Sequence, residues 1–257
     1  MLIPREHGAY GQLGFPILTV LAAGRPSLAA MLLVVASAAA FVAHEPMLVQ
    51  MGHRGPRAKR ELAQQARRML WATSALAIAA GLTGGWLMPP PIRWTVVIPA
   101  LFALAAFPLI AWRTHKQVGG EIYLAVSLSA AALPAGAASS LRIQDATLCA
   151  AIFALGFSAA TLAVRGTIAV QRREASSAMR VGAAALALAN LLLVAAATSR
   201  LSAHPLSWTA ALPLSMLTAA LAAAPPSARQ LYRIGWGLTA AATATAVVLV
   251  GLIRAGR

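Results

Sequence analysis

The sequence is poor in charged residues, in acidic residues above all, and in cysteine. Charged side chains make up 11% of the 257 residues, and only 6 residues are Asp or Glu. A soluble domain carries about a quarter of its residues as charged side chains. This scarcity therefore excludes an ordinary soluble domain. The single Cys149 excludes an intrachain disulfide and leaves the redox compartment open.

Apolar residues take the place of the missing charge and make up 60% of the chain. A membrane-spanning helix needs about 20 mostly apolar residues. Runs of this kind cover residues 8–24, 27–50, 69–88, 94–112, 121–140, 146–171, 180–198, 206–224 and 234–253. The sequence therefore predicts an all-α, polytopic transmembrane helix bundle of about nine spans. We expect one integral membrane domain over residues 1–257, with a retained first span rather than a cleaved signal peptide.

Basic residues decide the expected orientation. The formal net charge is +15, but the basic residues form short groups between apolar runs, so we expect contact with the lipid bilayer and no nucleic-acid binding. Lys and Arg collect in cytoplasmic loops. Fourteen of them fall in one set of alternating connectors and six in the other. This pattern predicts a cytoplasmic N-terminus and a C-terminus on the outside.

Ionisable side chains inside spans are costly and tend to face a bundle interior or a wet cavity. Those at span depth are Glu6, His7, His44, Glu45, Glu121 and Arg165, all in the predicted cytoplasmic half. His7, His44 and Glu45 are the candidate acids or bases, because histidine exchanges its proton near neutral pH. Glu45 and Arg165 lie at similar depth, so we expect them to interact directly or through a ligand or water. A purely structural clamp between two helices is the alternative.

Arginine is the main candidate for ligand binding, because its forked donors suit phosphate. We expect Arg54, Arg57, Arg165 and Arg172 to contact an anionic or phosphorylated lipid, with Glu121 and Tyr10 nearby. After the second run, Arg60, Gln64, Arg67 and Arg68 share one helical face that suits anionic headgroups.

A glycine stripe lies beside Tyr10 in the first run, at Gly8, Gly11 and Gly14. Small residues at this spacing permit the close approach of another helix. The stripe therefore predicts helix packing, or a backbone that lines a ligand pocket.

Two segments, PREHGAYGQLGFP and FVAHEPMLVQMGHRGPRAKRE, resemble the YwiC-like family of bacterial membrane proteins. The resemblance is clearest over the first 70 residues and implies a multi-pass protein of the bacterial inner membrane. It implies no particular activity.

The expected layout is also similar to that of the UbiA superfamily of intramembrane prenyltransferases. Those enzymes hold a prenyl diphosphate through magnesium, with Asp-rich motifs at the ends of helices two and six. Here the corresponding segments read HEPMLVQMGHRGPR and VRGTIAVQRRE, with one Glu each. Magnesium prefers carboxylate oxygens. A UbiA-like fold would thus bind an anionic lipid or isoprenoid without these motifs, and no UbiA catalytic residue is carried over.

Three functions remain open. The first is a UbiA-like enzyme or lipid-binding protein with a polar, basic, cytoplasm-facing cavity framed by spans one, two, five and six. The second is a transporter, for which Asn190 in the seventh run is the main polar group in the outer half. The third is a zinc or iron site formed by Glu6, His7, His44 and Glu45. Substrate, reaction and cofactor stay open.

Overall fold

A computed structural model describes residues 7–200, 207–227 and 230–256. Within these ranges every regular element is a helix, which confirms the all-α prediction. The α-helices are α1 (His7–Ala23), α2 (Leu28–Gln50), α3 (Pro56–Leu87), α4 (Val97–Ala111), α5 (Val118–Ala130), α6 (Ala132–Ala138), α7 (Ile143–Gln171), α8 (Ser177–Arg200), α9 (Leu212–Ala223) and α10 (Leu231–Ala255). Among the described residues, the 3-10 helices η1 (Pro90–Val96), η2 (Thr114–Lys116) and η3 (Ser207–Ala211) lie between them.

Each predicted apolar run falls on a helical segment. Among the described residues, seven segments are long and apolar enough to cross a membrane, while α1 and the end of η3 with α9 are shorter apolar helices. These segments support a multi-pass membrane protein, as the sequence predicts.

Two helical segments differ in their bounds from the sequence prediction. The third span was expected from residue 69, but α3 begins at Pro56, a residue suited to the first turn of a helix. Its 32 residues extend for about 48 Å at the α-helical rise. The fifth run was expected as one helix, but it divides at Ala131 into α5 and α6.

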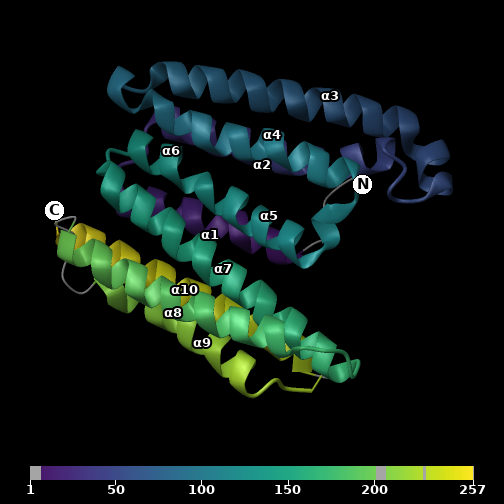
Figure 1. Cartoon of the computed structure of the whole chain (residues 1–257). Helices are drawn as coiled ribbons and strands as arrows, with labels where there is room; N and C mark the ends of the chain where they lie inside the picture. The colour runs from purple at the N-terminus through teal and green to yellow at the C-terminus, as the bar shows by residue number, and fades with distance from the viewer. Residues whose placement is uncertain (1–6, 201–206, 228–229, 257) are drawn as a thin grey trace.

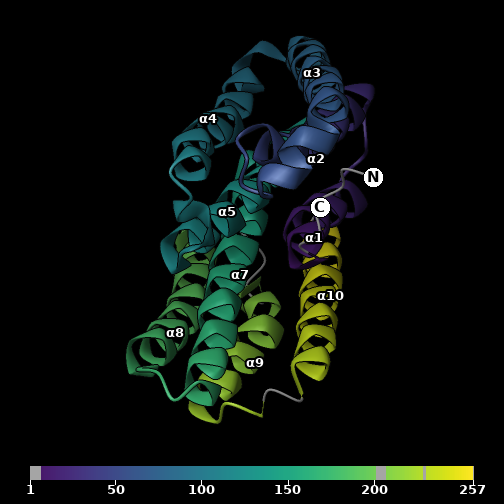
Figure 2. The same ribbon diagram turned by 90° about the vertical axis from the view of Figure 1, so that its right-hand side faces the viewer.

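The helices lie side by side in a layered bundle. α2, α3 and α4 form one side, α8, α9 and α10 form the other, and α1, α5 and α7 lie between them (Figures 1 and 2). The main core joins Val20 of α1, Phe153 of α7, Leu214 of α9 and Leu249 of α10. α7 is thus the central helix of the bundle.

The peripheral helices expose apolar and aromatic side chains. Leu82 of α3 and Leu104 of α4 are exposed, as are Trp71 and Trp86 of α3. Tryptophan is enriched at membrane interfaces, and 15 residues of helix separate these two by about 22 Å. The polar first turns of α3, before Trp71, therefore extend beyond the apolar layer.

Candidate functional site

The end of α2 is a glycine-dependent turn. The His53 amide donates to the Leu48 carbonyl at 2.9 Å, and the Gly52 amide donates to the Val49 carbonyl at 3.0 Å. Gly52 has φ of 75°, as this helix-ending motif requires. The chain therefore turns back sharply after α2.

This turn places Arg54 against Glu45 of α2. Arg54 Nε donates to Glu45 Oε1 at 2.7 Å, and Arg54 Nη2 donates to Oε2. The Glu45 side chain is only 6% exposed and that of Arg54 is 26% exposed. Arg54 thus forms a two-bond ion pair with a buried carboxylate, rather than presenting its whole fork to a ligand.

The end of α7 repeats the motif without glycine. The Glu174 amide donates to the Ala169 carbonyl at 2.9 Å, and the Arg173 amide donates to the Val170 carbonyl at 3.1 Å. Arg173 occupies the left-handed position, with φ of 58°. An L-residue with a side chain is strained in this conformation.

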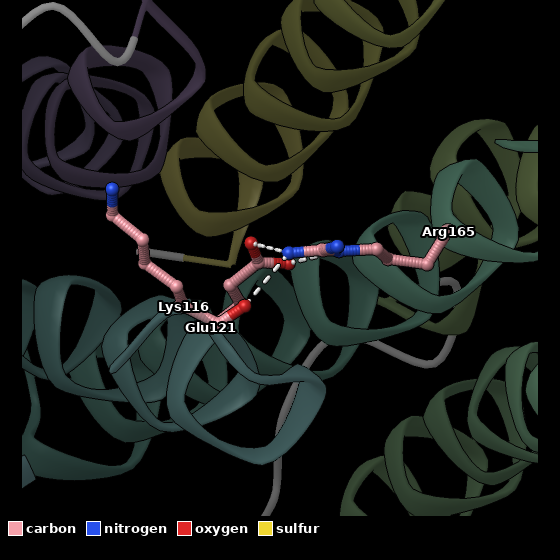
Figure 3. Close-up of polar contacts among 3 residues, drawn as sticks. All are labelled: Lys116, Glu121 and Arg165. Carbon is pink, nitrogen blue, oxygen red and sulfur yellow. Dashed lines mark hydrogen bonds and ion pairs between the residues drawn. The ribbon is translucent and has the colours of Figure 1, made fainter. Parts of the chain in front are cut away.

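A second arginine–carboxylate pair lies two turns before this end, between α7 and α5 (Figure 3). Arg165 Nε donates to Glu121 Oε2 at 2.8 Å. Arg165 Nη2 donates to Glu121 Oε1 and also to the Lys116 carbonyl, the latter at 2.9 Å. The Lys116 side chain extends away from the pair in Figure 3. One guanidinium therefore fastens α7 to α5 and to η2.

These two pairs show that the predicted direct contact of Glu45 with Arg165 is wrong. The alternative, an interaction through a ligand or water, stays a prediction. Each residue has a different partner, Arg54 and Glu121 respectively. The Glu121–Arg165 pair is also far more open than the other, with side chains 33% and 36% exposed.

The sequence alone did not predict which arginine pairs with which glutamate. It named Arg54 and Glu121 as ligand contacts, and it did not consider the Lys116 carbonyl. The signal for the Glu45–Arg54 pair was present, because Gly52 and Gly55 frame a turn directly after the helix that carries Glu45. No local pattern indicates that α5 and α7 are neighbours.

The remaining predicted ligand contacts lie at several places. Tyr10 of α1 meets Phe41 of α2 edge to face, with ring centroids 5.0 Å apart. Arg57 pairs with Glu61 at 2.7 Å on the exposed start of α3. Arg172 is exposed at the end of α7.

The predicted acid–base and metal groups are only partly described. His44 is half-buried on α2, directly before the buried Glu45. Glu6 and the side chain of His7 lie outside the described residues. Among the side chains that are described, no three His, Cys, Asp or Glu gather into a metal-binding group. The predicted His7, His44 and Glu45 trio, and the metal site, remain predictions.

The glycine stripe of α1 does not pack against another described helix. A Cβ added at Gly8 or Gly14 would meet no described atom within 4 Å, and one at Gly11 would meet only the Phe15 ring of the same helix. The predicted close approach is therefore wrong for the described part of the chain. The alternative, a backbone that lines a ligand pocket, stays a prediction.

Asn190, the polar group considered for transport, joins three helices. Its Nδ2 donates to the Ile152 carbonyl of α7 and to Ser215 Oγ of α9, each at 3.3 Å. Asn190 itself lies on α8 and is fully buried. These bonds give it a structural role in helix association.

A depression of about 300 Å³ lies between the end of α7 and the start of α10. It is lined by Thr167, Ile168, Gln171, Arg172 and Leu231. The lining therefore combines apolar side chains, Ile168 and Leu231, with an arginine and an amide. The predicted cavity was framed by spans one, two, five and six, and it remains a prediction.

The fold defines a polytopic helical membrane protein, with arginine–glutamate pairs near the ends of α2 and α7. A model of the YwiC-like protein family matches residues 3–136, which is more than half of the chain. The chain belongs to the YwiC-like family, as its N-terminal segments indicate. No curated protein and no solved structure matches the chain. The UbiA-like layout thus stays a prediction.

Proposed function

We propose that this chain is a multi-pass protein of the bacterial inner membrane that binds an anionic or phosphorylated lipid, including an isoprenoid, at its cytoplasmic side. The observation that carries the proposal is the lining of the depression between α7 and α10. Arg172 supplies charged donors there, and Ile168 and Leu231 supply apolar surface. Gln171 adds an amide whose Nε2 also donates to the Pro226 carbonyl at 3.2 Å. A lipid has the same two parts, a phosphate and a chain.

The chemistry of the lining suits a phosphate without a metal. Guanidinium binds phosphate through parallel, charge-assisted hydrogen bonds. The five lining residues include no carboxylate that would repel the anion. Ile168 and Leu231 can bury part of the lipid chain, which is favourable by the hydrophobic effect.

Exposed side chains of both charges lie beside the lining. Arg173 follows Arg172 and is exposed, with the exposed Glu174 next to it. In the orientation that the basic residues predict, this end of α7 meets the cytoplasmic leaflet, whose anionic lipids attract Lys and Arg.

Lipid binding to the purified protein tests this proposal. In nanodiscs of phosphatidylcholine with added phosphatidylglycerol, we expect Arg172→Gln to weaken binding of the anionic lipid roughly tenfold, the value of one charge-assisted hydrogen bond. Arg173→Gln is the matched control, because it removes the same charge one residue away from the lining. Equal losses in both variants would show non-specific attraction and contradict the site.

A further inference from the structure

Arg165 is bound to a carboxylate of the protein itself, at a position that is partly exposed. Its Nε and Nη2 form two bonds to Glu121, the arrangement that a guanidinium also offers to a phosphate. Nη2 is further oriented by the Lys116 carbonyl at 2.9 Å. About a third of each side chain in the pair is exposed. The fork is therefore preorganised and accessible, and Glu121 takes the place of an anionic ligand.

Arg165 also lies on the same helical face as Arg172. Seven residues separate them, which is nearly two turns and about 10 Å along the axis. Side chains on a helix lean toward its N-terminus, so both arginines lean in the same direction and keep this spacing. A headgroup bound in the depression at Arg172 is thus about two helical turns from Arg165.

We propose that Glu121 is an exchangeable counter-ion of Arg165 and that this exchange selects lipids with a phosphomonoester headgroup. This inference rests on the proposed function and specifies its ligand class. A phosphodiester carries one negative charge, as Glu121 does, so its exchange for Glu121 gains nothing and breaks the link between α5 and α7. A phosphomonoester carries about −1.5 to −2 charges at pH 7. It can therefore satisfy Arg165 and Arg172 together.

A purely structural clamp makes a different prediction. If Glu121 only fastens α5 to α7, its removal loosens the fold and changes the binding of both lipid classes alike. An exchangeable counter-ion affects the ratio between the classes, because the carboxylate keeps a phosphodiester from the guanidinium, whereas a phosphomonoester displaces it.

The test compares phosphatidic acid, a phosphomonoester, with phosphatidylglycerol, a phosphodiester, in nanodiscs that contain the full chain. We expect the wild-type protein to bind phosphatidic acid roughly tenfold more tightly, the worth of one added charge-assisted bond. Glu121→Gln removes the competing charge. It should raise the affinity for phosphatidylglycerol and bring the ratio toward one.

Glu61→Gln is the control for net charge. It removes an equal charge from the exposed partner of Arg57, and we expect the ratio to stay at the wild-type value. Arg165→Gln gives an independent reading if Glu121→Gln folds poorly. It should also bring the ratio toward one, but by weakening phosphatidic acid.

The outcomes separate this inference from the proposed function. If Arg172→Gln weakens both lipids while Glu121→Gln and Arg165→Gln leave the ratio unchanged, Glu121 is only a clamp and the inference is overturned. If the wild-type protein binds neither lipid better than phosphatidylcholine, the proposed function itself is wrong. If the ratio of the affinities for phosphatidic acid and phosphatidylglycerol falls in Glu121→Gln and Arg165→Gln and stays unchanged in Glu61→Gln, the result supports Glu121 as an exchangeable counter-ion.

Discussion

The ends of α2 and α7 have the same kind of turn and the same kind of ion pair, but the two ion pairs differ in burial and in the segments that they join. Both helices finish in the same hydrogen-bonded turn, and near each end an arginine donates two hydrogen bonds to a glutamate. At α2 the partners are nine residues apart and the carboxylate is buried. At α7 they are 44 residues apart, and each side chain is about a third exposed. The first pair stabilises the turn after α2, while the second joins segments that are distant in the sequence and is accessible to a ligand.

Burial decides how firmly each pair is held. A buried charge that loses its partner is left unsolvated, which costs several kcal/mol. A partly exposed charge that loses its partner recovers water, so the loss is smaller. The pair at α7 can therefore exchange its carboxylate at a lower cost than the pair at α2.

The largest effect is expected at the buried pair. Arg54→Gln leaves Glu45 without a cation and should lower the free energy of unfolding in detergent by about 3 to 5 kcal/mol. Adding Glu45→Gln should recover most of that loss, which a double-mutant cycle measures. Arg57→Gln is the exposed control, with an expected loss below about 1 kcal/mol. Equal losses for Arg54→Gln and Arg57→Gln would contradict the role of burial.

A smaller effect is expected at the partly exposed pair of Arg165 and Glu121. Arg165→Gln should lower the free energy of unfolding by about 1 to 2 kcal/mol, because charge-assisted bonds are lost but water replaces them in part. When it is combined with Glu45→Gln, the two losses should add within about 0.5 kcal/mol, since the pairs are separate. A strong coupling between Glu45 and Arg165 would instead indicate that they share a partner.

The smallest effects are expected at the two turns, where the helix ends differ by one residue type. Arg173→Gly should raise the free energy of unfolding by about 1 kcal/mol, because glycine relieves the left-handed strain. Gly52→Ala should lower it by a similar amount, since φ there is also positive. Thermal unfolding of both variants checks that Arg173→Gly stabilises the protein and that Gly52→Ala destabilises it. A loss of stability in Arg173→Gly would show that its side chain makes contacts worth more than the strain.

The sequence predicted where the helices lie along the chain better than it predicted which helices pack side by side. Each apolar run became a helical segment because burial in lipid requires internally bonded backbone. The third span was expected only over the apolar residues from residue 69, whereas α3 also includes the polar residues from Pro56. The predicted helical segment with Arg60, Gln64, Arg67 and Arg68 on one face is confirmed as helix, because it is part of α3. Backbone helicity does not require an apolar face once the helix leaves the membrane.

The ion pairs could not be predicted in full, because depth along a span does not fix direction around it. Glu45 and Arg165 do lie near the same set of helix ends, yet each faces another partner. The contact of Arg54 with Glu45 follows from the turn at Gly52, so it was within reach of sequence reasoning. The contact of Arg165 with Glu121 depends on α5 packing beside α7, which composition does not encode.

The lipids that copurify with the protein test the central claim most directly. Native mass spectrometry after extraction in mild detergent should show an anionic lipid retained by the wild-type protein above its share of the membrane. Arg172→Gln should lose that enrichment, while Arg173→Gln keeps it. Bound lipids in the same proportions as the bulk membrane, in all three proteins, would contradict an anionic-lipid site at the end of α7.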